Sequence, residues 1–274
     1  MTAHARFRAT IRSLTGIELP DHKVSMIEQR LRRRVAHWKF SDTDQYLSAL
    51  LRDELPEEEL RMVVDLMTTN TTSFFRESEH FDLLRSRVLP DILSRKSNHK
   101  PRIKIWSAAS SEGAEAYTIA MVLAEAVRTG RRFDWAILGT DISSRMIEKG
   151  DQAVYLAEQI TTVPAEMAQR YIMMGAVGTS AGKARIVPEL RRKVHFREMN
   201  LMDATYPIDT DVDAIFLRNI LIYFDAPTKA AVVHRVARHL APGGYLFVGH
   251  SESMIVREPG LAQIVPTVFQ KALT

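Results

Sequence analysis

The chain has 274 residues, of which 46% are hydrophobic, and it carries 37 Lys and Arg against 33 Asp and Glu. That much apolar material builds a full core, which excludes a disordered or fibrous protein. The absence of Cys excludes disulfides, thiolate metal sites and Cys nucleophiles. No apolar run approaches the roughly 18 residues that span a bilayer, and the first residues lack a signal-peptide core. We therefore expect a cytoplasmic protein that does not insert into the membrane.

The front of the chain is predicted to form short amphipathic helices with an uneven distribution of charge. Residues 1–40 hold nine Lys and Arg against three acidic residues, whereas residues 41–67 hold two against eight. The net charge of +4 hides this contrast. A basic isoelectric point near 9.3 does not by itself indicate nucleic-acid binding.

One of these helices carries a basic face. Its apolar stripe recurs at helical spacing and is formed by Val24, Ile27, Leu31, Val35 and Trp38. Arg30, Arg33 and Arg34 are expected on the opposite side, where they are either solvated or dock an acidic partner. Asp21 is the expected N-cap of this helix, and Ser41 that of the next.

From about residue 102 the pattern changes to alternating strands and helices. Strands are expected at 103–109, 135–141, 194–200, 213–219, 245–251 and 264–272, and helices at 115–130, 143–154 and 226–244. This alternation predicts an α/β fold with a mostly parallel, doubly wound sheet. We expect a helical domain at 1–70, a linker and connecting helix at 71–95, and a sheet domain at 96–274. Residues 165–193 interrupt the alternation and are predicted to form a small inserted β-subdomain.

The loop after the first strand, SSEGAEAY, indicates which ligand the sheet holds. Dinucleotide folds use G-x-G-x-x-G here, whereas this loop has only Gly113 and places Glu112 and Glu115 beside the site. Two carboxylates disfavour a pyrophosphate and attract a cation, which favours S-adenosylmethionine. Asp141 ends the second strand and can accept hydrogen bonds from ribose hydroxyls. The alternatives are a first-turn acid for Glu115 and a helix N-cap for Asp141.

Several motifs resemble a known family. They are TTNTTSFFRE (68–77), WSAASSEGAEAYTIAM (106–121), GTDIS (139–143), MNL (199–201), DAIFLRNILIYFD (213–225) and LAPGGYLFVGHSES (240–253). Over nearly its whole length the chain resembles the chemoreceptor glutamate methyltransferases, the CheR family. The resemblance implies a helical domain joined to a class I methyltransferase sheet with an inserted β-subdomain. Similar proteins usually have Glu and Pro where this chain has Ala114 and Ala116.

The resemblance also implies which positions bind S-adenosylmethionine. These are Asn70, Thr72, Arg76, Glu115, Asp141, Asn200, Leu201, Arg218 and Asn219. A bidentate Arg76 suits the methionyl carboxylate, with a linker-to-sheet salt bridge as the alternative. Glu115 suits the ammonium group. Asn200 and the backbone of Leu201 suit the adenine edge, unless Asn200 is only a turn residue.

The implied reaction needs little acid–base assistance. A glutamate carboxylate with a pKa of about 4.3 is already ionised near pH 7, so it can attack the sulfonium methyl without a general base. Alignment then supplies most of the catalysis. Tyr223 and Arg218 are the predicted catalytic residues, although Tyr223 is equally well explained as a core aromatic. No metal is expected, because the nine His show no ligand spacing.

The implied partners are the cytoplasmic domains of membrane chemoreceptors, and the products are glutamate methyl esters and S-adenosylhomocysteine. Arg30, Arg33 and Arg34 are the predicted docking residues for acidic receptor helices. We expect a monomer located at receptor arrays that does not bind nucleic acid. Two alternatives stay open: a nucleic-acid methyltransferase, which the acidic residues of 41–67 oppose, and a non-enzymatic module that senses S-adenosylmethionine. The sequence leaves open whether 165–193 grips a receptor tail, as in some relatives.

Overall fold

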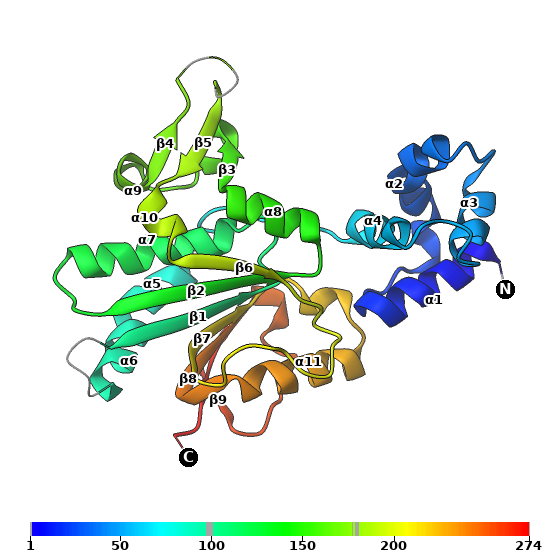
Figure 1. The fold of residues 1–274 in the computed structure, drawn as a ribbon. Helices are drawn as coiled ribbons and strands as arrows, with labels where there is room; N and C mark the ends of the chain where they lie inside the picture. Colours follow the sequence, from blue (N-terminus) through cyan, green and yellow to red (C-terminus); the bar gives the residue numbers. More distant parts are fainter. Residues whose placement is uncertain (1, 97–100, 177, 179–180, 274) are drawn as a thin grey trace.

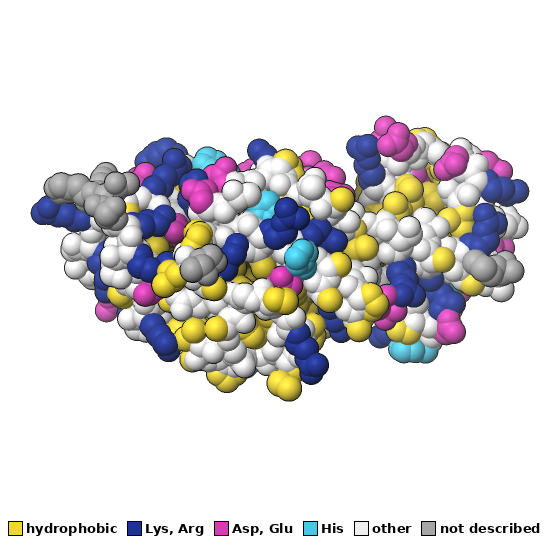
Figure 2. Space-filling model, turned by 90° about the horizontal axis from the view of Figure 1, so that it is seen from below, with side chains coloured by type: hydrophobic (Ala, Val, Ile, Leu, Met, Phe, Trp, Pro, Cys, Tyr) yellow, Lys and Arg dark blue, Asp and Glu magenta, His cyan; other side chains and the backbone are white. Residues whose placement is uncertain are grey.

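The structure is a computed structural model that describes residues 2–96, 101–176, 178 and 181–273. Its N-terminal part is a unit of four helices, α1 (Ala3–Thr15), α2 (Val24–His37), α3 (Thr43–Leu50) and α4 (Glu57–Met67). This unit has its own core, which includes Phe7, Ile11, Ile27, Leu31, Tyr46, Leu47, Val63 and Met67. It lies to one side of the sheet and forms a lobe of its own at the right of the space-filling view (Figures 1 and 2).

Two expected helix caps differ from the structure. Asp42, not Ser41, caps α3, because its carboxylate accepts the N–H of Gln45 at 2.8 Å. Ser41 instead donates its hydroxyl to Asp42. Asp21 begins a 3₁₀ turn, η1 (Asp21–Lys23), ahead of α2, and its carboxylate pairs with Arg8. The sequence pattern located the helices but misassigned the side chains that begin them.

The basic face of α2 is only partly exposed. Arg30 donates to three carbonyl oxygens around the end of α4, at 2.8–3.1 Å, and Arg34 pairs with the buried carboxylate of Glu59. The expectation that Arg30 and Arg34 lie away from the packed side is therefore wrong. The reason is that α4 packs beside α2. The last carbonyls of α4 have no acceptor role within the helix and are satisfied by Arg30, and the buried carboxylate of Glu59 on α4 is neutralised by Arg34. Arg33 is exposed, as expected.

The second part of the chain is built on a seven-stranded sheet. Its strand order is β6 (Val194–Glu198), β2 (Asp134–Asp141), β1 (Arg102–Ala108), β7 (Val212–Leu217), β8 (Leu240–Val248), β10 (Val268–Lys271) and β9 (Leu261–Val265). The first five strands are parallel, whereas β10 pairs antiparallel with both β8 and β9, which confirms the predicted mostly parallel sheet. The single strand expected at 264–272 is instead the hairpin β9–β10. The helix expected at 226–244 ends at Arg238, and Pro242 already lies in β8.

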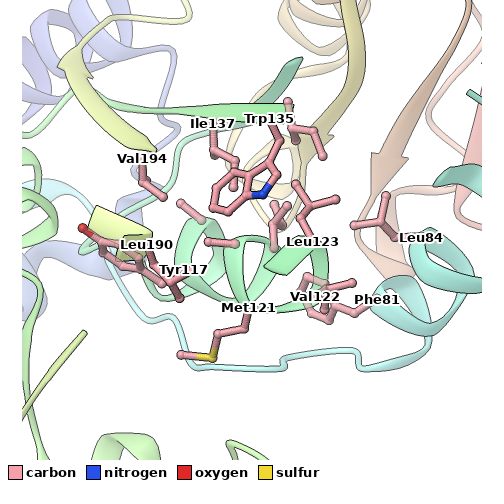
Figure 3. Close-up of a cluster of buried hydrophobic side chains, with 14 of the residues drawn as sticks. Phe81, Leu84, Tyr117, Met121, Val122, Leu123, Trp135, Ile137, Leu190 and Val194 are labelled. Carbon is pink, nitrogen blue, oxygen red and sulfur yellow. The ribbon is translucent and has the colours of Figure 1, made fainter. Parts of the chain in front are cut away.

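Helices cover both faces of this sheet. One face carries α5 (Glu79–Leu83), a π-helical turn η2 (Leu84–Val88), α6 (Leu89–Arg95) and α7 (Ala114–Arg128), and the other carries α11 (Ala226–Arg238). Figure 3 shows Leu123 of α7 next to Trp135 of β2, with Tyr117 of α7 beside Leu190. Both faces being covered explains the nearly continuous apolar run of β7. The parallel strands end at one edge, where such sheets bind ligands.

A small antiparallel sheet follows α8 (Ser144–Gln152). Its order is β3 (Val154–Leu156), β5 (Lys183–Ile186) and β4 (Ile172–Met174), with η3 (Ala157–Ile160), α9 (Ala165–Tyr171) and α10 (Pro188–Arg191) around it. The inserted β-subdomain thus begins earlier than the expected residue 165, because β3 pairs with β5. It projects from the main sheet above α8 in Figure 1. Among the helices of the described residues, none has the length and hydropathy of a membrane span.

Candidate active site

A cavity lies at the carboxyl ends of β1, β2 and β7, where the end of α1 and the 68–76 linker meet the sheet. It encloses about 910 Å³ of space, including its open mouth. The predicted site residues that line it are Asn70, Thr72, Arg76, Glu115, Asp141, Asn200, Leu201, Arg218, Asn219 and Tyr223. The fold therefore brings every predicted cofactor and catalytic position together. The sequence did not predict the contribution of α1, whose Thr15 and the following Ile17 also line the cavity.

Asp141 is the most enclosed carboxylate on the cavity wall. It is 7% exposed, and its two oxygens accept the backbone N–H groups of Ser111 (2.9 Å) and Ser143 (3.0 Å). Burial raises the pKa of Asp141, and these N–H groups oppose the rise. The N-cap of α8 is Ser143, so the alternative of Asp141 as that cap is wrong. Each Asp141 oxygen keeps a lone pair for a further donor.

Glu115 and Arg218 form a buried ion pair across the cavity wall. Glu115 Oε2 lies 2.8 Å from Arg218 Nη1, and Glu115 Oε1 accepts the hydroxyl of Ser107 at 2.6 Å. Arg218 Nη2 also lies 3.2 Å from Glu77 Oε2 and donates to the carbonyl of Arg76 at 2.5 Å. Arg218 therefore ties the linker to β7 as well as facing the cavity. The sequence did not predict that Glu115 would have a cationic partner.

The second acid of this loop, Glu112, does not face the cavity. Its carboxylate contacts Lys149 at 3.1 Å and Gln159 at 2.6 Å, toward α8 and the small sheet. Gly113, at φ +87°, turns the chain between this residue and α7. The expectation of two acids beside the site is therefore wrong for Glu112. The charged side chains that line the cavity are balanced: Glu115 and Asp141 against Arg76 and Arg218.

Arg76 is the cation of this wall that no carboxylate of the described residues neutralises. The residue is half-buried, and its Nη1 donates to the carbonyl of Thr71 at 3.1 Å. The alternative of a linker-to-sheet salt bridge is therefore not what the structure shows. The linker is fixed in another way, because the carbonyl of Asn70 accepts the hydroxyl of Ser111 at 2.8 Å. Arg76 is left with donors for an anionic ligand group.

Asn200 lines the cavity, but both polar atoms of its side chain are hydrogen-bonded within the protein. Its Nδ2 donates to the carbonyl of Leu14 at 2.6 Å, and its Oδ1 accepts the N–H of Met202 at 2.9 Å. The carbonyl of Leu201 accepts from Tyr206 and Arg235. This geometry supports the turn alternative for Asn200. The Leu201 N–H has no backbone acceptor among the described residues and is left for a ligand.

The loop after β7 is organised by Glu252, a residue that the sequence analysis missed. Glu252 is 0% exposed, and its carboxylate accepts the N–H groups of Asn219 (2.8 Å), Leu221 (2.7 Å) and Gly249 (2.7 Å). Asn219 adopts φ +59°, and Tyr223 follows in the short helix η5 (Leu221–Tyr223). Glu252 therefore fixes the backbone that carries two cavity residues. Its position far along the chain, within GHSES, gave no signal of this contact.

Comparison with known proteins identifies the chain. Residues 3–68 match the CheR methyltransferase all-alpha domain, and residues 70–269 match the CheR methyltransferase SAM binding domain. The chain belongs to the CheR methyltransferase family. It is 38% identical to chemotaxis protein methyltransferase 2 of Pseudomonas aeruginosa, over 97% of this chain and 91% of that protein. It is 37% identical to the chemotaxis protein methyltransferase of Escherichia coli, over 90% of this chain and 83% of that protein.

These matches confirm the predicted family and fold class. The CheR chain is a methyltransferase with a domain for S-adenosylmethionine, and its cavity lies within that domain and at its border with the helical unit. The roles of the individual cavity residues stay predictions.

Proposed function

We propose that this CheR protein methylates glutamate carboxylates on the cytoplasmic domains of chemotaxis receptors, with S-adenosylmethionine as the methyl donor. The products are glutamate methyl esters and S-adenosylhomocysteine. The observation that carries the proposal is one cavity at the sheet edge that holds both a buried acceptor, Asp141, and a guanidinium, that of Arg76, which pairs with no carboxylate in the part of the chain that the structure describes. The chemotaxis names of the relatives support the receptor as substrate.

The donor groups of the cavity fit S-adenosylmethionine. Asp141 has lone pairs for the ribose hydroxyls, and Arg76 has donors for the methionyl carboxylate. Ser110 lines the cavity with a buried hydroxyl that has no hydrogen-bond partner among the described residues. A ligand would satisfy this group, which is costly to leave unpaired. Glu115 is placed for the ammonium group, although it shares its charge with Arg218.

The remaining cavity residues suit a carboxylate acceptor. Bound S-adenosylmethionine supplies an electrophilic methyl group, and an ionised glutamate can attack it without a base from the protein. Tyr223 is the proposed donor that orients the acceptor oxygen. Ile220 and Phe224 line the same side and exclude water, so the acceptor loses part of its hydration. Arg218 is proposed to attract the acceptor, an effect that its pairing with Glu115 reduces.

Fewer residues of α2 are available for the proposed receptor docking than the sequence suggested. Arg33 is exposed and available to an acidic helix, whereas Arg30 and Arg34 are used within the helical unit. We propose that these two act indirectly, by holding α2 against α4. On the face shown in Figure 2, basic and acidic side chains are interspersed. The proposal includes a monomer at receptor arrays that does not bind nucleic acid.

The test is methyl transfer from tritiated S-adenosylmethionine to receptor-containing membranes. We expect labelled receptor that releases methanol in alkali, because only a carboxyl ester is base-labile among the products considered. Label in nucleic acid would favour the nucleic-acid methyltransferase, and cofactor binding without turnover would favour the sensor module. Arg33→Glu should slow receptor methylation and change its salt dependence, whereas Arg52→Glu, on an exposed residue after α3, should not.

A further inference from the structure

Two His and one Glu meet behind the cavity, and one of the two His comes from far along the chain. Glu77 ends the linker motif, His80 lies in α5, and His250 begins the short helix η6 (His250–Glu252). One ligand atom from each lies within 4.8 Å of the others. Two imidazoles and a carboxylate form a donor set that zinc and its neighbours in the transition series prefer.

The separations fit a tetrahedral ion. Glu77 Oε2 lies 3.5 Å from His80 Nδ1 and 3.6 Å from His250 Nε2. Bonds of the usual length to tetrahedral zinc place neighbouring ligand atoms about 3.4 Å apart. The three side chains could therefore bind one ion without a large rearrangement.

Two of these atoms accept or donate no hydrogen bond among the described residues, although Glu77 Oε2 lies 3.2 Å from Arg218 Nη2. His80 is 1% exposed, and neither its Nδ1 nor Glu77 Oε2 has a hydrogen-bond partner among the described residues. The other ring nitrogen of His80 lies 2.6 Å from the hydroxyl of Thr267. When Nε2–H donates to Thr267, the lone pair of Nδ1 faces a carboxylate oxygen. Two facing acceptors are stabilised by a cation between them, and the Thr267 contact is the outer-shell support typical of a metal-binding imidazole.

The local charge also favours a divalent cation. Glu79 Oε1 lies 2.7 Å from His250 Nε2, so a second carboxylate borders the cluster. Arg218 contacts Glu77 and also pairs with Glu115. The carboxylates of Glu77, Glu79 and Glu115 together with this one guanidinium carry a net charge of about −2. His250 is more than half exposed, which opens the cluster to solvent.

We propose that Glu77, His80 and His250 bind a divalent transition-metal ion of the zinc class, with Glu79 or water as a fourth ligand. Such an ion would fasten the linker, α5 and η6 to one another. Because η6 also carries Glu252, the ion would stabilise the turn that fixes the loop after β7. The proposal does not depend on the identity of the methyl acceptor.

The experiment is a titration of the full chain, purified without a polyhistidine tag and stripped with a chelator, with Co²⁺ and then Zn²⁺. We expect one equivalent of Co²⁺ to give the intense visible bands of tetrahedral coordination, Zn²⁺ to displace it, and Zn²⁺ to raise the melting temperature. His250→Ala, on an exposed side chain, should weaken binding by more than about tenfold, since even outer-shell losses cost 10–100-fold.

His234→Ala is the matched control. His234 is a similarly exposed His that lies 2.9 Å from a carboxylate, that of Glu258, but outside the cluster. It should leave Co²⁺ affinity unchanged. The proposal is overturned if the wild-type chain shows no saturable binding, if His250→Ala binds as tightly as the wild-type chain, or if both variants lose affinity equally.

Discussion

Replacing the buried carboxylate of Glu252 tests whether the loop after β7 is held by this side chain. In Glu252→Gln, one oxygen becomes an NH₂ group, which cannot accept a backbone N–H. Glu252 Oε2 accepts two N–H groups and Oε1 accepts one, so the best amide orientation still loses the bond to Leu221. A hydrogen bond to a charged acceptor contributes about 1.5–3 kcal/mol, so we expect a loss of stability in that range.

The thermal consequence should be measurable. At roughly 2–4 °C per kcal/mol for a chain of this size, the melting temperature should fall by about 3–12 °C. Glu252→Ala should cost more, because it leaves three backbone N–H groups without their acceptor, although it also removes the cost of burying a charge. Glu258→Gln is the control, since that acid pairs with the half-exposed His234 and neither residue lines the cavity.

The functional consequence separates positioning from simple stability. Asn219 and Tyr223 lie on the loop that Glu252 organises, so Glu252→Gln should weaken S-adenosylhomocysteine binding by about tenfold, or 1.4 kcal/mol. Isothermal titration calorimetry well below the melting temperature measures this. A lower melting temperature with wild-type affinity would refute the positioning role and leave Glu252 as a structural residue only.

Three further predictions concern single carboxylates and cations. Arg76→Lys should weaken S-adenosylhomocysteine binding by about tenfold in calorimetry, because Lys lacks the bidentate fork, whereas the exposed Arg85→Lys should not. Burial raises the pKa of Asp141, so this carboxyl protonates at a higher pH than an ordinary Asp. S-adenosylhomocysteine affinity should therefore fall as the pH is lowered through that raised pKa, and Asp141→Asn should remove this dependence. Burial raises the pKa of Glu59, but the hydrogen bonds from Arg34 and Tyr46 outweigh this effect, so the pKa is lowered overall. The stability that the Glu59 carboxylate contributes is therefore fully present above the unfolded-state pKa and is lost as the pH falls through the folded-state pKa. Glu59→Gln should destabilise by roughly 2–3 kcal/mol in urea unfolding, against less than about 1 kcal/mol for the exposed Glu57→Gln.

The parts of the fold that depend on local pattern could be predicted from the sequence. Alternating apolar runs and capped helices indicated the parallel sheet, and parallel strands must end at one edge. Asp141 ends one such strand and Arg218 directly follows another, so their meeting in one cavity followed from topology. The three-residue strand β3 was missed because it follows α8 without a turn signal, and its pairing with β5 is distant in sequence.

Partners of buried polar groups could not be predicted in this way. Arg30 and Arg34 lie on the polar side of their own helix, yet both contact α4. Arg30 donates to the carbonyls at the end of α4, and Arg34 pairs with Glu59. Glu112 and Glu115 are three residues apart, yet the turn at Gly113 directs Glu112 to Lys149 of α8 and Glu115, in the first turn of α7, to Arg218. Each of these contacts depends on which neighbouring element packs against the residue. The sequence pattern of a single helix or strand does not contain that information.

The contribution of α1 to the cavity leads to a prediction at Gly16. This residue ends α1 at φ +74°, and its N–H donates to the carbonyl of Arg12 at 2.8 Å. A Cβ there would lie 2.6 Å from Met202 Sδ and 3.1 Å from the ring of Phe224. The Met202 side chain can move, but the ring of Phe224 is buried and lines the cavity. Gly16→Ala should therefore strain the backbone and also push α1 away from the cavity wall.

A second glycine separates these two effects. Gly130 also has a positive φ, +102°, but among the described residues no atom beyond its own chain neighbours lies within 4 Å of the position its Cβ would take. Gly130→Ala should thus show the backbone penalty alone, about 1–2 kcal/mol, with wild-type affinity for S-adenosylhomocysteine. Gly16→Ala should lose at least as much stability and bind S-adenosylhomocysteine several-fold more weakly. Equal binding by the two variants would mean that α1 can shift without affecting the ligand, and that the helical unit is not a functional wall of the site.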